Sequence, residues 1–419
     1  MSLNRVAITG CGVVTPIGQS VDEMMQSLEA GASGTRTMGN WNRFGQLRCQ
    51  VGAPAELRNP AAIPRQFRRT MSRMSIFAAQ ASMQALLQAG IDPAGLASNP
   101  RIGCIMGSTT GSPETITQSY ETLFCTHDYT LLGAAEFFRC VSHTVALNVA
   151  QYLGLKGMVS ATAAACASGL QAIGSAYDLV RLGRQDVVLC GGAEELHETA
   201  VGTFDILYAA SSKYNNDPQK TPRPFDAGRD GLVCGEGAGV VTLESYDHAI
   251  QRGAEILAEV VGYHTCNNGI HVSQSDATSM ATCMRTALKD AGMEPSEIGY
   301  VNAHATGTLQ GDLAEAKAIA DVFGPDVPVS SLKGHMGHTL GASGAIELAA
   351  TIVMMNRGIV YPTRNLEIID PECVGLRLIR ETTPHRFSAF LKNSFAFGGI
   401  NASLVCRQID ALTAEGYPE

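Results

Sequence analysis

Short apolar runs rich in β-branched residues alternate with longer segments of helical periodicity, and this alternation limits the fold of the chain most strongly. The predicted strands lie at 5–10, 185–192, 238–245, 255–263, 298–305 and 327–331. The predicted helices lie at 21–30, 72–89, 168–182, 279–291, 313–323 and 343–356. This order of elements predicts an α/β protein.

A weak internal symmetry accompanies the alternation. A strand, a glycine-rich turn and a helix of small residues occur around Cys166, and a similar arrangement recurs around KGHMGHTLGASGAIE. No linker rich in proline, serine or charge separates the two parts. We therefore expect two structurally duplicated halves in one unit, the first at 1–253 and the second at 254–411, followed by a tail at 412–419.

Charge and hydropathy exclude several classes of function. The 419-residue chain has a formal net charge of −9, which favours neither a nucleic-acid nor a membrane-surface role. No apolar run approaches the roughly 20 residues that span a bilayer. The first residues carry no pattern of an export signal, so we expect a cytoplasmic protein with no membrane and no nucleic acid among its partners.

The cysteines indicate neither a zinc site nor a disulfide framework. There are 12 of them, and no two lie within three residues of each other, so the paired spacing of a zinc site is missing. Most stand in apolar segments, which predicts buried, reduced thiols and agrees with a cytoplasmic location.

Cys166 is the cysteine that raises a chemical question. It stands alone among small residues in SATAAACASGLQA, at or just before the helix predicted from 168. In such surroundings a cysteine often only fills space in a core. A helix N-terminus, however, favours a thiolate and lowers its pKa, and its free N–H groups can stabilise an oxyanion. The local pattern leaves both interpretations open, a core residue or a nucleophile.

Four of the ten histidines lie in segments where function is plausible. His304 ends the predicted strand in YVNAHATGT, and His271 lies in a polar loop. His335 and His338 lie in a glycine-rich turn that leads into a helix. Their HxxH spacing is that of a metal pair, but no third ligand accompanies it, so we predict no metal site.

Several motifs together resemble one known family. Cys166 is followed by NAH at 302–304, by the Lys–GH–GA–G–E run from 333 and by NSFAFGGIN from 393, and the chain also contains VAITGCGVVTPIG and RPFDAGRDGLVCGEGAG. In this order they resemble the β-ketoacyl-acyl-carrier-protein synthases, most of all the synthase II branch and the related polyketide ketosynthases. The resemblance covers nearly the whole chain. It implies a thiolase fold, with two duplicated halves in five α-β-α-β-α layers.

The resemblance also implies an activity and a catalytic set. The implied enzyme is an acyltransferase, a 3-oxoacyl-[acyl-carrier-protein] synthase of the synthase II type (EC 2.3.1.179-like). It joins an acyl group to malonyl-carrier by decarboxylative Claisen condensation and elongates a fatty-acid-like, polyene or polyketide chain. Cys166 matches the acyl-accepting nucleophile, while His304 and His338 match the histidines that promote decarboxylation and stabilise the enolate.

Further residues match supporting positions of the family. The resemblance assigns Lys333 and Glu347 to the polar network behind the histidines. It assigns Thr306 and Thr308 to binding of the pantetheine arm. Phe397 matches a gating phenylalanine whose backbone N–H joins that of Cys166 in an oxyanion hole.

The implied partner is an acyl carrier protein. Such carriers are acidic, so an acidic enzyme needs a local basic patch, and PRQFRRTMSR supplies one. The resemblance places carrier docking at Arg65, Arg68 and Arg69, although a merely solvated basic helix face is the alternative. No cofactor is implied, because the phosphopantetheine belongs to the carrier. The implied assembly is a homodimer, or a heterodimer with a chain-length-factor-like subunit.

The chain departs from the family pattern at three places. Its FAFGGIN has Ala396 and Ile400 where the synthase II pattern has glycine and threonine, so gate motion is expected to differ. Thr110 stands where an aliphatic residue often closes the acyl pocket. The loop around His271 lacks a proline-rich tip. These departures leave a specialised polyene or polyketide synthase open.

Other functions fit the motifs less well. Initiating synthases use a Cys-His-Asn set and degradative thiolases use a second catalytic cysteine, whereas this chain has two histidines in NAHAT and KGHMGH. A non-catalytic chain-length subunit is disfavoured by the intact catalytic set. A papain-like peptidase leaves the GH and FGG motifs without a role.

Overall fold

The structure is a computed structural model that describes residues 3–373 and 375–409. Within these residues, eleven strands are hydrogen-bonded into one mixed sheet. Their order across the sheet is β12-β10-β9-β14-β15-β8-β1-β7-β6-β4-β5. The strands are β1 (Val6–Val14), β4 (Ile102–Gly107), β5 (Val159–Thr162), β6 (Val187–Glu194), β7 (Gly237–Ser245), β8 (Ala258–Asn267), β9 (Tyr300–Asn302), β10 (Pro328–Ser330), β12 (Arg377–Leu378), β14 (Ala389–Phe395) and β15 (Ile400–Arg407).

The two halves of this sheet repeat the same strand pattern. In the first half, β1 and β7 are antiparallel, β7 and β6 are antiparallel, and β6, β4 and β5 run parallel. In the second, β8 and β15 are antiparallel, β15 and β14 are antiparallel, and β14, β9 and β10 run parallel. The short pairing of β1 with β8 joins the halves. The structural duplication predicted from the weak sequence symmetry is therefore confirmed.

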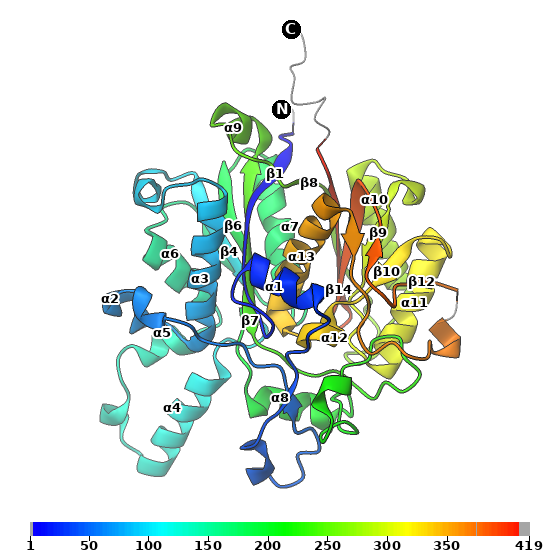
Figure 1. Cartoon of the computed structure of the whole chain (residues 1–419). Coiled ribbons are helices and arrows are strands. Elements are labelled where there is room, and N and C mark those ends of the chain that lie inside the picture. The colour runs from blue at the N-terminus through cyan, green and yellow to red at the C-terminus, as the bar shows by residue number, and fades with distance from the viewer. Residues whose placement is uncertain (1–2, 374, 410–419) are drawn as a thin grey trace.

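Helices cover both faces of each half-sheet and complete the layers. Outer helices α3 (Arg73–Gln88) and α6 (Thr144–Leu153) pack on the first half, and α10 (Ala277–Ala291) packs on the second beside α11 (Leu309–Phe323). Helices α7 (Ser168–Arg181) and α13 (Ser343–Arg357) lie side by side in the middle, between the half-sheets (Figure 1). The five-layer α-β-α-β-α thiolase arrangement is confirmed.

The remaining elements are shorter and lie around this frame. The other helices are α1 (Val21–Glu29), α2 (Arg65–Arg68), α4 (Pro113–Thr126), α5 (Glu136–Cys140), α8 (Glu198–Ile206), α9 (Tyr246–Gln251) and α12 (Lys333–Met336). Two small antiparallel sheets of two strands each pair β2 (Arg36–Thr37) with β3 (Val51–Gly52) and β11 (Ile359–Val360) with β13 (Thr383–Pro384). The boundary expected at 253 falls between α9 and β8, and the tail at 412–419 lies outside the described residues.

All six predicted strands and all six predicted helices are present, with shifted ends. The other five strands of the main sheet, β4, β5, β12, β14 and β15, were not predicted. Strand β14 reads AFLKNSF, and all seven of its residues are buried. Lysine and asparagine are mostly exposed in proteins, so their presence in the centre of this segment does not predict a buried strand. In the structure, Lys392 and Asn393 are both fully buried.

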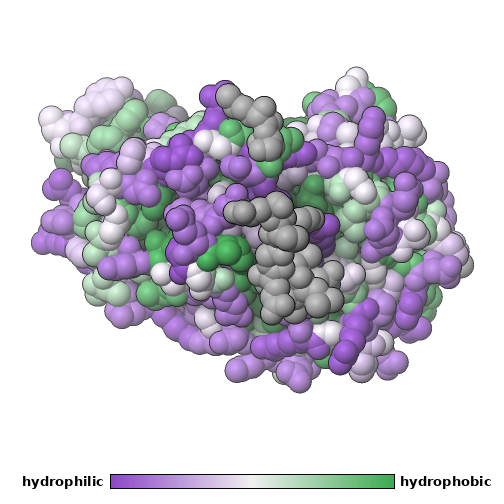
Figure 2. Space-filling model, turned by 90° about the horizontal axis from the view of Figure 1, so that it is seen from above, coloured by the Kyte–Doolittle hydropathy of each residue, from purple (hydrophilic) through white to green (hydrophobic). Residues whose placement is uncertain are grey.

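The surface of this frame is mixed in polarity. Seen from the end where both termini lie, hydrophilic residues predominate around the rim and hydrophobic areas lie between them (Figure 2). No helix in the described ranges is both long and apolar enough to cross a bilayer.

Close approach between the central helices and the sheet depends on residues without a side chain. At Gly239 in β7, an added Cβ would lie 2.4 Å from the backbone nitrogen of Ile346 in α13. At Gly202 in α8, an added Cβ would meet nothing within 4 Å. The two glycines therefore differ in what an added methyl group does.

Gly239→Ala should lower the free energy of unfolding by about 1–3 kcal/mol or more, because the methyl group overpacks the contact between β7 and α13. Gly202→Ala is the matched control and should raise it by up to about 1 kcal/mol through helix propensity. Denaturant titration measures both changes. An unchanged midpoint for Gly239→Ala would contradict this packing.

Candidate active site

Cys166 lies in the sharp turn between β5 and α7. It precedes the first residue of α7 by two positions, as the sequence predicted. Ala165 before it has a φ of 48°, a left-handed conformation that is strained for alanine. The turn holds the Cys166 side chain at the start of the helix, where it is only 3% exposed.

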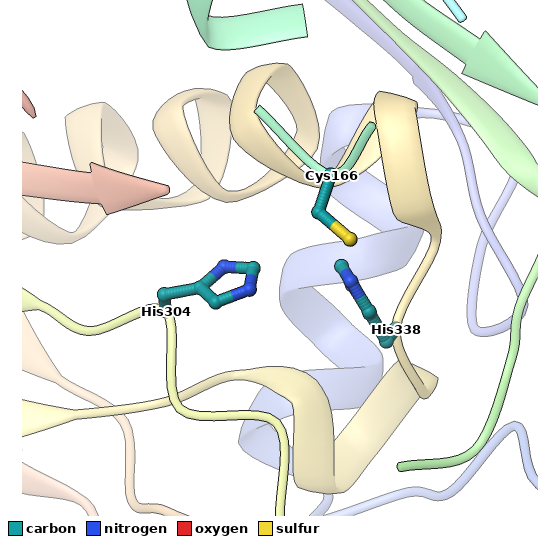
Figure 3. Close-up of side chains that lie close together, drawn as sticks. All are labelled: Cys166, His304 and His338. Carbon is teal, nitrogen blue, oxygen red and sulfur yellow. The ribbon is translucent and has the colours of Figure 1, made fainter. Parts of the chain in front are cut away.

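The two predicted histidines meet Cys166 from the other half of the chain. His304 follows β9, and His338 lies between α12 and α13. The Cys166 Sγ and one ring nitrogen of each histidine lie within 4.8 Å of one another. The histidine rings are edge to face, with centroids 5.1 Å apart. All three side chains point toward one another (Figure 3).

The duplication explains this convergence. Cys166 lies between β5 and α7, and His338 lies between β10 and α13, at the equivalent place in the second half. Because α7 and α13 pack against each other in the central layer, the turns that precede them come together. Two segments that are separated along the chain by five strands, β6 to β10, thus form one site.

Both histidines are held neutral. Burial lowers the pKa of His304 and of His338 well below the usual value of 6.5, and the positive charge of Lys333 acts in the same direction. Nδ1 of His338 lies 2.9 Å from the Ser343 hydroxyl oxygen. Its Nε2 is buried and has no hydrogen-bond partner among the described residues. A neutral imidazole can donate or accept at such a free nitrogen.

The Cys166 thiol differs from the expectation that the helix start lowers its pKa. Burial raises the pKa of Cys166 to about 12, and the opposing effect of Lys333 is smaller. The resting group is therefore a thiol at neutral pH. Its nucleophilic use requires a proton acceptor, and the adjacent neutral histidines are of the right type.

A hollow opens beside these three side chains. Thr306 and Thr308 line it, with their hydroxyl oxygens 3.2 Å apart. Phe397 also lines it, and its ring contacts Phe204 of α8 at a centroid distance of 5.8 Å. The hollow thus brings the predicted pantetheine and gate residues to the same space as Cys166.

Behind the histidines lies a buried ionic network. Lys333 Nζ donates to Glu347 Oε1 at 2.6 Å, which places these two residues together as predicted. Three further members were not predicted: Lys392 lies 2.7 Å from Glu347, Ser343 contacts His338, and Glu315 accepts the backbone N–H of His304 at 2.8 Å. The sequence signals for two of them are a lysine within an apolar strand and a glutamate among alanines in LAEAKAIA.

The predicted docking arginines lie elsewhere on the surface. Arg65, Arg68 and Arg69 line a shallow hollow together with Arg139 of α5. This segment is not one continuous helix, since α2 ends at Arg68 and α3 begins at Arg73. Arg73 forms an ion pair with buried Glu236 at 2.8 Å, so its charge is partly neutralised by the core.

Two other sequence-based expectations concern single residues. Thr110 is exposed and is not among the residues that line the hollow beside Cys166, so its role in an acyl pocket stays a prediction. His335 directs Nδ1 and Nε2 at the carbonyl oxygens of Ala32 and Pro362, at 3.1 and 3.2 Å. This arrangement fits a structural role for His335.

The donor set also resembles part of a metal site. One thiol and two imidazoles are ligands that zinc accepts, and a zinc site needs at least three protein ligands. No fourth histidine, cysteine or carboxylate joins these three side chains among the described residues. The arrangement suits a nucleophile with two neutral hydrogen-bonding groups better than a metal centre.

Comparison with known proteins gives the family. Residues 3–249 match the family model of the β-ketoacyl synthase N-terminal domain, and residues 257–367 match that of the C-terminal domain. The chain belongs to the β-ketoacyl synthase family.

Three relatives show the extent of the similarity. The chain is 35% identical to 3-oxoacyl-[acyl-carrier-protein] synthase 1 of Escherichia coli K12, over 97% of this chain and 100% of the relative. A β-ketoacyl synthase structure from Burkholderia phymatum is 45% identical, with a TM-score of 0.94 and coverage of 97% and 100%. A type II polyketide ketosynthase, AntDE, solved with its acyl-carrier protein AntF, is 31% identical, with a TM-score of 0.89 and coverage of 98% and 100%.

The alkylation of Cys166 by iodoacetamide should depend steeply on pH. Because the group is a thiol at neutral pH, its rate should rise about tenfold per pH unit between about pH 7 and about pH 9. Peptide mapping by mass spectrometry follows Cys166 separately from the other cysteines. A rate that is constant over this range would show that the resting group is already a thiolate.

Proposed function

We propose that this chain is an elongating β-ketoacyl-[acyl-carrier-protein] synthase in which Cys166, His304 and His338 carry the chemistry. The observation that supports this most is the convergence of a buried thiol and two neutral imidazoles beside one hollow. Membership of the β-ketoacyl synthase family supplies the reaction class.

The first step transfers an acyl group to the enzyme. The Cys166 sulfur attacks the thioester carbonyl of acyl-carrier, its proton passes to a neutral histidine, and the carrier thiol leaves with a proton. A new thioester forms as the old one breaks, so the acyl group stays activated. The backbone N–H groups of Cys166 and Phe397 stabilise the oxyanion in this proposal.

The second step forms the new carbon–carbon bond. Malonyl-carrier loses its carboxylate as CO₂, and the electron pair of the broken bond forms an enolate. Neutral His304 and His338 donate hydrogen bonds to the enolate oxygen, where negative charge develops. The enolate carbon attacks the acyl-Cys166 carbonyl, and the released Cys166 sulfur takes up a proton. β-Ketoacyl-carrier leaves.

The proposal includes a carrier partner and no cofactor on this chain. Thr306 and Thr308 line the hollow, which supports the proposal that they contact a pantetheine arm entering it. The AntDE–AntF complex is an acyl-carrier protein bound to its ketosynthase, which supports an acyl carrier as the partner here. We propose that the enzyme acts as a homodimer or with a chain-length-factor-like subunit. A cytoplasmic location remains part of the proposal.

Within the family we propose that this chain is a synthase of the synthase II type. The alternative is a specialised synthase that elongates a polyene or polyketide chain. The motif order supports this type, whereas the 35% identity to a synthase 1 does not distinguish the branches. A panel of acyl-carriers of different length and unsaturation, each assayed with malonyl-carrier, decides which chain is elongated.

Incubation with acyl-carrier should add the mass of one acyl group to the wild-type protein and none to Cys166→Ala. His338→Ala should still be acylated but should release CO₂ from malonyl-carrier on the order of 10²-fold more slowly, as expected for loss of one oxyanion donor. Intact-protein mass spectrometry and CO₂ release measure the two effects. No adduct on wild type, or full decarboxylation by His338→Ala, would contradict the assigned roles.

Reversal of Arg65, Arg68 and Arg69 to glutamate should raise the apparent KM for the carrier substrate about tenfold or more, since like charges then oppose an acidic partner. The kcat should change little, because these residues lie away from Cys166. Arg386→Glu, an exposed arginine in the other half, is the control. An unchanged KM in the triple variant would show that the carrier does not dock at these three arginines.

A further inference from the structure

Lys392 is a buried cation that the roles assigned so far do not use. Its side chain is fully enclosed, at 0% exposure, in the middle of β14. Buried lysines are rare unless they are paired, because removing an ammonium group from water is costly. The neighbours of Lys392 therefore show why this charge is kept.

Lys392 shares a carboxylate with Lys333. Lys392 Nζ lies 2.7 Å from Glu347 Oε2, while Lys333 Nζ lies 2.6 Å from Glu347 Oε1. All three side chains are at most 1% exposed. One glutamate thus holds two ammonium groups away from water, so one positive charge remains in excess within this cluster.

This cluster is connected to His338 through α13. Ser343, whose hydroxyl contacts His338 Nδ1, precedes Glu347 by four residues and shares its helix face. Lys333 starts α12, which leads directly to His338. The position of Glu347 is therefore linked to the orientation of the His338 ring.

The cluster is connected to His304 through the sheet. Lys392 pairs with Asn302 in the parallel register of β14 and β9, two residues before His304. The next residue, Asn393, points to the opposite face of the sheet and donates to Glu315 Oε1 at 3.2 Å. Glu315 in turn accepts the backbone N–H groups of His304 and Ala305 at 2.8 and 2.6 Å.

We infer that Lys392 is a positioning residue for the condensation step: its fixed positive charge balances the buried carboxylates and keeps both histidines as neutral hydrogen-bond donors for the enolate. This inference rests on the proposed function. With Lys392 present, the two ammonium groups balance two buried carboxylates: both contact Glu347, and Glu315 attracts Lys392 over a longer distance. Without it, the same space holds one more negative charge than positive charges.

The sign of the effect follows from Coulomb interactions in a buried site. An excess negative charge stabilises an imidazolium and disfavours an enolate anion nearby. Lys392 acts with Lys333 to lower the pKa of His304 and of His338. Burial also lowers the pKa of Lys392 itself to about 8, against the raising effects of Glu347 and Glu315.

The first experiment compares Lys392→Met with Lys289→Met, a control at an exposed lysine of α10. Lys392→Met should be acylated at Cys166 like wild type, because acyl transfer does not form the enolate. Its release of CO₂ from malonyl-carrier should fall about tenfold or more at neutral pH, less than the 10²–10³ typical of losing a direct oxyanion donor. The acid limb of its pH–rate profile should move to higher pH.

A second variant separates charge from packing. Lys392→Ala should be equally slow and should regain activity in methylammonium chloride, which restores a small cation beside Glu347. Tetramethylammonium chloride at equal ionic strength is the control, since it is too large for the space of one lysine head group. An unshifted pH profile in Lys392→Met, or no specific rescue of Lys392→Ala, would overturn the inference.

The two levels of the proposal fail in different ways. If wild type is not acylated at Cys166 or releases no CO₂ from malonyl-carrier, the proposed function is wrong. If wild type performs both steps and the Lys392 variants match it in rate and pH profile, only the role of Lys392 is wrong.

Discussion

The shared carboxylate of Glu347 is the interaction on which the arrangement of the site depends. It forms ion pairs with two ammonium groups, those of Lys333 and Lys392, where none of the three side chains is appreciably exposed. Removing one partner of such a group leaves an uncompensated buried charge, at a cost of several kcal/mol. The ion pairs therefore fix the positions of α12, α13 and β14 relative to one another. They thereby also fix the positions of His304 and His338, which lie next to these elements.

The duplicated fold brings the reactive side chains together. It places the Cys166 turn and the His338 turn at equivalent ends of the two central helices, which pack against each other. Burial then acts in opposite senses on the two kinds of group: it keeps the cysteine a thiol and keeps the histidines unprotonated. A thiol beside neutral imidazoles can pass its proton on attack, and neutral imidazoles can then donate to an enolate. The same enclosure therefore serves both halves of the proposed reaction.

The sequence predicted the parts of this account that depend on local pattern. Alternation of apolar runs identified six strands, and the motifs around Cys166, His304 and His338 identified residues that the fold brings together. It did not predict β14, because Lys392 and Asn393 interrupt its apolar run, and their burial is stable only with Glu347 and Glu315 from distant helices. The expected lowering of the Cys166 pKa was wrong for a related reason. The helix start is visible in sequence, whereas the enclosure that outweighs it is a property of the assembled layers.

The proposed chemistry depends most on one property: both histidines are neutral in the free enzyme at neutral pH. A histidine-selective NMR titration of the free enzyme tests it directly, with His304→Gln and His338→Gln used to assign the two ring signals. The account predicts that both signals keep the chemical shifts of neutral imidazole from about pH 8 down to about pH 5.5, where an ordinary histidine has become protonated. Titration of either ring near the usual value of 6.5 would contradict it.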